Sequence, residues 1–270
     1  MIFRRNKKQR SEPETVETDE LAATDDVDDA ALADEGSADG DLADDSAEES
    51  PEDELARLDE LEWRGDGPWD ISEIDDLEST EGRPRIDLGS IVLTGVPGSE
   101  LRLQVAEDTN QIISAMLVIE TIVVSPDGAG PESYSSALEL GAYAAPRSGG
   151  LWAELRDDIS ASAAAEGGSA SMAEGPFGVE LRRLMPVTTP DGQQGYQPSR
   201  MWVAEGPRWL LRGIVYGQAA VEDDPESPVV AEVLDAFRQV VVRRGDEAMA
   251  PGDLLPLTMP ANATAEGEES

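Results

Sequence analysis

The charged side chains of greatest chemical interest in this chain lie inside segments that are otherwise apolar. Arg212 interrupts the apolar run EGPRWLLRGIVYG at 205–217. A guanidinium there must be paired or must face a ligand, because an uncompensated buried charge is strongly destabilising. Glu180, in a strand predicted over 177–184, is a plausible partner. We favour a structural Arg–Glu pair and keep an anion-binding site as the alternative. Four further arginines could enlarge such a site: Arg182, Arg183, Arg200 and Arg208.

A second candidate lies at a predicted strand-to-helix turn made of Arg147, Ser148, Gly149 and Gly150. Free backbone N–H groups at the start of a helix bind anions, and the arginine would assist them. The sequence contains neither GxxxxGK[ST] nor GxGxxG at this place, so no nucleotide-binding motif supports the idea. We favour a tight structural turn, with an anion or partner site as the alternative.

The residue types that are missing exclude several kinds of chemistry. The chain has no cysteine and no histidine, and its lysines are Lys7 and Lys8. Disulfides, thiolate nucleophiles, the usual zinc sites and the commonest general base are therefore excluded. We expect no cofactor, no metal site and no catalytic residue. The alternative is a carboxylate- or divalent-cation-dependent hydrolase near residues 147–151.

The first part of the chain is strongly acidic. The formal net charge is −38, and between Glu12 and Glu81 only Arg57 and Arg64 interrupt the acidic residues. Such a segment cannot bury enough apolar surface to offset its chain entropy, so we predict a disordered tail over 1–66, basic and then acidic. The acidic part supplies solubility and reach. Capture of a basic partner, or nucleic-acid mimicry, is the alternative.

Residues 1–10, MIFRRNKKQR, make the basic start of this tail. Ser11-Glu12-Pro13-Glu14 follows, in place of the uninterrupted apolar region of a secretory signal. We therefore expect a cytoplasmic protein without a transmembrane segment. A solvated basic start is favoured over a weak peripheral membrane contact or a nucleic-acid tether.

Order is expected to return in two short pieces before the main domain. Ser50-Pro51 has the pattern of a helix start, as an N-cap residue followed by proline at the first helical position. Next, a segment at 67–82 contains three apolar residues that do not suit a free tail: Trp69, Ile71 and Ile74. We predict a docking segment that binds the protein's own domain, or, alternatively, a linear motif for a partner.

One α+β domain is predicted over 83–260, followed by a disordered tail over 261–270. Turn formers such as Pro126-Asp127-Gly128 and Pro190-Asp191-Gly192 join successive strands, which predicts a mostly antiparallel sheet. The expected strands are 85–93, 100–105, 111–124, 135–144, 178–187, 195–204 and a central strand within 205–217.

Two helices are expected to pack on this sheet. The first follows Ser148 as its N-cap residue, ends at Gly167-Gly168 and turns Arg156 toward water. The second begins at Ser227-Pro228 and continues through Val241. An apolar strap over 249–257 closes the domain. The arrangement is a layer of helices on a sheet, with a topology similar to the Mog1/PsbP-type sandwich.

Several blocks of the sequence resemble a family of uncharacterised proteins from high-GC actinobacteria, a conserved domain of unknown function. These blocks are GPWDISEIDD, RIDLGS, AYAAPRSGGLWAELRDDI, EGPFGVELRRLMPV, GPRWLLRGIVYG and RRGDEAMAPGDLLPL, and the match spans 67–260. The resemblance implies a cytoplasmic actinobacterial protein. It assigns no catalytic residue.

The sequence as a whole favours a non-catalytic binding or scaffold protein that interacts with another protein. We expect no nucleic-acid binding by the folded domain, because the domain is acidic and phosphate contact requires clustered cations. The identity of the partner and the oligomeric state do not follow from the residues.

Overall fold

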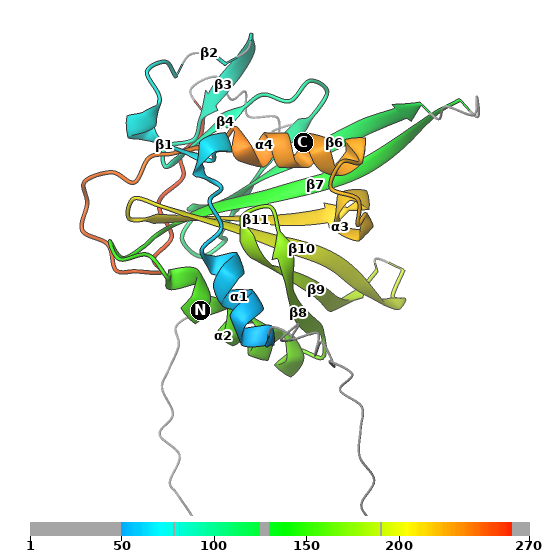
Figure 1. Ribbon diagram of the computed structural model, residues 1–270. Helices are drawn as coiled ribbons and strands as arrows, with labels where there is room; N and C mark the ends of the chain where they lie inside the picture. Colours follow the sequence, from blue (N-terminus) through cyan, green and yellow to red (C-terminus); the bar gives the residue numbers. More distant parts are fainter. Residues whose placement is uncertain (1–49, 78, 81, 125–129, 190, 261–270) are drawn as a thin grey trace, which may run out of the picture. The chain divides into compact units, whose positions relative to one another are not determined.

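The computed structural model describes residues 50–77, 79–80, 82–124, 130–189 and 191–260 (Figure 1). The predicted tail residues 1–49 and 261–270 lie outside the described residues. So do residues 126–128 and Pro190 of the two predicted turns.

A seven-stranded antiparallel sheet forms the body of the protein, in the order β5-β6-β7-β11-β10-β9-β8. Its strands are β5 (Glu100–Val105), β6 (Ile112–Val124), β7 (Pro131–Ala144), β8 (Ser169–Gly175), β9 (Gly178–Thr188), β10 (Gln194–Gly206) and β11 (Trp209–Gly217). The protein is thus α+β with a mostly antiparallel sheet, as predicted. The predicted central strand is confirmed as β11, the fourth of the seven.

A smaller sheet of short strands lies beside the first, in the order β1-β12-β4-β3-β2. Its strands are β1 (Trp69–Asp70), β2 (Ser79–Thr80), β3 (Arg83–Asp87), β4 (Ile91–Thr94) and β12 (Val241–Val242). The pairing of β1 with β12 is parallel, whereas the other pairs in this sheet are antiparallel.

The helices lie on opposite faces of the large sheet. They are α1 (Pro51–Asp59), α2 (Leu151–Ala165), α3 (Gln218–Val221) and α4 (Pro228–Arg238), with 3₁₀ turns η1 (Arg64–Asp66) and η2 (Ile71–Glu73). Helix α4 packs on β6 and β7, whereas α2 packs on β8, β9 and β10 (Figure 1). None of the described helices is long and apolar enough to cross a membrane.

Two apolar clusters follow from the alternation of side chains along β11. Trp209, Leu211 and Val215 point into the larger cluster, which includes α4. Leu210 and Ile214 point into the smaller cluster under α2. Successive residues of a strand face opposite sides, so a strand that is apolar at nearly every position must be covered on both faces.

The structure corrects several predicted boundaries. The strand predicted over 85–93 is divided into β3 and β4, because Gly89 adopts a left-handed φ of 85° and turns the chain. Strand β8 was missed, since its small and polar residues carry little β signal. The second helix ends at Arg238 rather than continuing through Val241, because Val241 and Val242 pair with β4.

Residues 50–66 were predicted to belong to the tail, but they carry α1 and η1, and the helix start predicted at Ser50-Pro51 is confirmed. Leu58 is buried, and the carboxylate of Asp59 pairs with Arg156 of α2 at 2.5 Å. A side-chain carbon at Gly178 of β9 would lie 2.5 Å from the Leu58 carbonyl, so α1 rests directly on the strand backbone. Arg156, which was predicted to face water, is buried by this contact.

The segment that follows α1 lies against the small sheet. The backbone N–H of Trp69 donates to the carbonyl of Val240 at 2.9 Å. The Asp70 carboxylate accepts a hydrogen bond of 2.7 Å from the indole of Trp209, the first residue of β11. Ile71 and Ile74 are half-buried. Trp69 and Asp70 of the predicted docking segment therefore contact the protein's own domain.

Candidate functional site

A cluster of polar side chains lies on the face of the large sheet that α2 covers in part. We call it the sheet-face cluster: Glu139, Tyr143, Arg183, Arg212 and Tyr216. The register explains the grouping, because residues paired across neighbouring strands point to the same face. Arg212 is paired with Gly141 of β7, between the pairs that contain Tyr143 and Glu139. Tyr216 lies on the same face of β11, two residue pairs beyond the pair that contains Glu139.

Two contacts organise the centre of this cluster. The guanidinium of Arg212 lies over the ring of Tyr143, 5.1 Å from its centroid. The hydroxyl of Tyr216 donates to the carboxylate of Glu139 at 3.3 Å. Gly141 has no side chain, and the Tyr143 ring lies over its backbone. A side-chain carbon at Gly141 would lie only 3.2 Å from the Tyr143 hydroxyl. The missing side chain makes room for the tyrosine ring.

Both tyrosines of the cluster are held in their neutral form. Burial raises the pKa of Tyr216 to about 12, and the charge of Glu139 adds to this effect. Burial also raises the pKa of Tyr143, although the positive charge of Arg212 opposes the change. Each phenol therefore keeps its proton at neutral pH and can donate it in a hydrogen bond.

The face around Arg212 is only partly covered. Helix α2 makes its main contacts with β8, β9 and β10, and α4 packs on the opposite face of β6 and β7. Arg212 is half-buried, and among the described residues it has no ion-pair partner within 4.0 Å. Its Nε atom has no hydrogen-bond partner either. Arg183, the other cation of the cluster, likewise has no hydrogen-bond partner for Nε.

The predicted pair between Arg212 and Glu180 is wrong. Glu180 lies on β9, which is separated from β11 by β10, and its side chain points to the opposite face of the sheet. It accepts hydrogen bonds from Arg200 at 3.0 Å and from the indole of Trp202 at 2.8 Å. Arg182 also donates to it at 3.0 Å and reaches Asp223 at 2.6 Å.

This second ionic group is structural. Glu180 is 1% exposed and Arg200 is 5% exposed, so Arg200 would be left as a buried charge without an ion-pair partner among the described residues if Glu180 were removed. Breaking a buried pair in this way costs about 3–5 kcal/mol. Arg200 also reaches the carbonyl of Glu222 at 3.3 Å, which fastens α3 to β10.

The Arg147–Gly150 turn already holds an anionic group of the protein itself. The two carboxylate oxygens of Glu205 accept hydrogen bonds of 2.6 Å from the backbone of Gly150 and Trp152. The predicted N-cap residue, Ser148, is replaced by Gly150, whose φ of 82° is left-handed. Glu205 belongs to β10, so only the folded sheet brings it to the helix. Arg147 is exposed.

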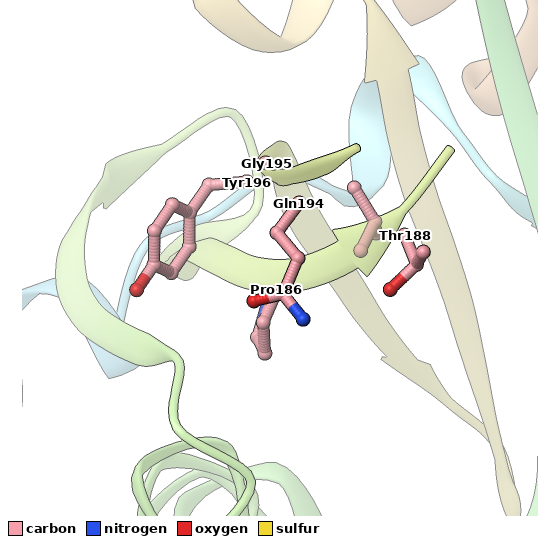
Figure 2. A pocket seen from close by; sticks show the side chains of 6 residues that line it. Pro186, Thr188, Gln194, Gly195 and Tyr196 are labelled. Atoms are coloured by element: carbon pink, nitrogen blue, oxygen red, sulfur yellow. The ribbon is translucent and has the colours of Figure 1, made fainter. Parts of the chain in front are cut away.

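Hollows in the described surface away from this cluster include the following two. The first, of about 750 Å³, runs along the C-terminal strap and is bordered by Val105, Ile112, Leu254 and Met259. The second, of about 220 Å³, lies on the β9–β10 hairpin, and Figure 2 shows it with Tyr196 at one end and Thr188 at the other. In the part of the chain that the structure describes, no group of three or more carboxylates forms a metal site.

Comparison with known proteins gives one match. Residues 67–266 match the family described as "Protein of unknown function (DUF3710)". The chain belongs to the DUF3710 family. No curated protein and no solved structure matches it. The similarity to the Mog1/PsbP-type sandwich therefore stays a prediction, as does the actinobacterial source. In this DUF3710 protein, α1 and η1 lie before the first matched residue.

Proposed function

We propose that this DUF3710 protein is a non-catalytic, cytoplasmic binding protein that recognises an anionic group of a partner protein through the sheet-face cluster. The observation that carries the proposal is Arg212: a half-buried guanidinium on a partly open sheet face, without an ion-pair partner among the described residues. A buried or half-buried cation normally has a counter-charge, and here a ligand would supply it.

The composition of the cluster favours a carboxylate or phosphate ligand. Arg183 and Arg212 contribute two cations against one carboxylate, that of Glu139. The planar guanidinium of Arg212 presents donors in a geometry that suits either anion, and its stacking on Tyr143 restricts its orientation. Glu139 accepts a hydrogen bond from the hydroxyl of Tyr216, which leaves the hydroxyl of Tyr143 for the ligand.

The strong negative charge of the whole chain makes this proposal easy to test. A protein with a formal charge of −38 repels anionic peptides, so binding of one requires a local cationic site. We would measure the fluorescence anisotropy of labelled acidic and phosphorylated peptides with the full chain at 0.15 M salt.

We expect Arg212→Ala to weaken binding about 10–100-fold, which corresponds to the loss of a charge-assisted hydrogen bond. The matched control is Arg57→Ala, since Arg57 is an exposed arginine of α1. Equal affinities for the wild type and Arg212→Ala, or no affinity for any anionic peptide, would contradict the proposal.

A further inference from the structure

Strand β6 extends beyond its neighbour β5. The last residue of β6 that is paired with β5 is Val118, opposite Glu100. Residues 119–124 are paired with β7 on one side only, as far as Val124 opposite Pro131. Within the described residues, no other backbone hydrogen bond reaches 119–124. One edge of this segment therefore presents free backbone donors and acceptors.

The free edge is held firmly in strand conformation from one face. Ile119 is 1% exposed and packs in the larger apolar cluster. The hydroxyl of Thr121 donates to Glu232 of α4 at 2.6 Å. A segment that is already ordered loses little conformational entropy when another strand pairs with it.

The opposite face of the same segment is apolar and exposed. Ile122 is 68% exposed and Val124 is 71% exposed. In Figure 1 the β6–β7 hairpin extends past the end of β11. Proteins usually protect an edge strand with lysine, proline or a bulge, because an apolar free edge pairs with other chains. The sequence IETIVV at 119–124 has a single charged residue, Glu120.

We propose that residues 119–124 form an interaction surface that accepts an extended segment of a partner protein as an additional β-strand. Backbone hydrogen bonds supply affinity in this mode, and alternating side chains supply specificity. Two apolar side chains of the partner strand, at alternate positions, would contact Ile122 and Val124.

Charge identifies the kind of partner. Glu120 lies on the exposed face beside the two apolar residues, where it accepts a hydrogen bond of 3.1 Å from Ser133 of β7. The partner strand therefore carries cationic side chains next to its apolar ones. A second copy of this chain is disfavoured as the occupant, because each copy carries a formal charge of −38.

The test uses the full chain and a labelled peptide, acetyl-Lys-Thr-Val-Thr-Val-Thr-Lys-amide. The comparison peptide has the same sequence with N-methyl groups at alternate residues. The two peptides have equal charge, so they interact equally with acidic residues elsewhere in the chain. The methylated peptide cannot complete the backbone hydrogen bonds of a strand pair.

We expect the unmethylated peptide to bind at least tenfold more tightly than the methylated one, and Ile122→Lys to remove this difference. Val105→Lys, at an exposed apolar residue of β5, and Arg212→Ala are expected to leave it unchanged. Equal binding of both peptides, or no binding, overturns the proposal. A concentration-dependent dimer that Ile122→Lys abolishes also overturns it, in favour of a second copy as the occupant.

Discussion

Single residues in this protein show that the environment of a charge decides its role. Arg200 and Arg212 both lie on strands of the large sheet. Arg200 is saturated by Glu180 and the Glu222 carbonyl, whereas Arg212 contacts an aromatic ring. We therefore assign a structural role to Arg200 and propose a binding role for Arg212. The same reasoning makes Glu205 a structural residue, because both of its oxygens are used by α2.

Tyr216 is expected to make stability depend on pH in alkaline solution. Its pKa is raised from 10.0 to about 12, so the folded protein keeps a proton that the unfolded chain releases. The contribution is fully present below pH 10 and is lost as the pH rises to about 12. In urea unfolding, Tyr216→Phe should show a smaller fall in free energy of unfolding across this range.

The control for this titration is Tyr196→Phe, which removes an exposed tyrosine of the β9–β10 hairpin. It should keep the wild-type dependence on pH. If Tyr216→Phe follows the wild-type curve as well, the phenol of Tyr216 is not the group responsible.

At the scale of elements, the docking segment depends on one buried contact. Asp70 accepts hydrogen bonds from the Trp209 indole and from the backbone and hydroxyl of Ser72. Burial by itself raises the pKa of Asp70, but these hydrogen bonds outweigh it and lower the pKa. The charged carboxylate is therefore the form that holds β1 against β11.

Asp70→Ala should lower the free energy of unfolding by about 1–3 kcal/mol, because the indole N–H of Trp209 is left buried without an acceptor. Chemical denaturation followed by tryptophan fluorescence would measure the change. Asp158→Ala, at an exposed aspartate of α2, is the matched control and should have little effect. A loss of the same size in both variants would show that the contact is not specific.

The elements were predictable where local pattern decides them, and the site was not. Residues 100–105 were predicted as a strand and form β5. A strand between clear turn residues can be predicted from the local sequence without knowing its neighbours in the fold. The positions Glu139 and Tyr143 share a face by their spacing alone. They lie beside Arg212 because β7 pairs with β11, and these two strands are far apart in the sequence. The carboxylate of Glu205 at α2 was missed for the same reason.

At the scale of the whole molecule, the described residues between 50 and 260 form one compact unit. The N-terminal pieces contribute Leu58, the Asp59–Arg156 pair and the edge-to-face contact of Trp63 with Phe177 at 5.8 Å. These contacts involve β9, the residue before it and α2, which packs on the large sheet. The matched DUF3710 region therefore depends on residues that precede it.

Truncation tests this dependence. A chain that starts at residue 50 should keep the wild-type Tm to within about 2 °C, because the composition of the removed acidic residues predicts a disordered tail. A chain that starts at residue 83 should lose several kcal/mol, since Arg156 loses its counter-charge and Trp209 its acceptor. Calorimetry would measure both. Equal Tm values for the two truncated chains would show that residues 50–82 do not stabilise the domain.

The parallel pairing of β1 with β12 also determines how the protein resists mechanical force. The chain enters β1 from its N-terminal side and leaves β12 toward the C-terminus, and the two strands run in the same direction. Once α1 and the C-terminal strap have been pulled away, a pull on the two ends therefore draws the strands past each other along their length. The bonds between them, including that from Trp69 to Val240, are loaded in shear and at the same time. The hydrogen bonds between β1 and β12 must therefore break together rather than one after another.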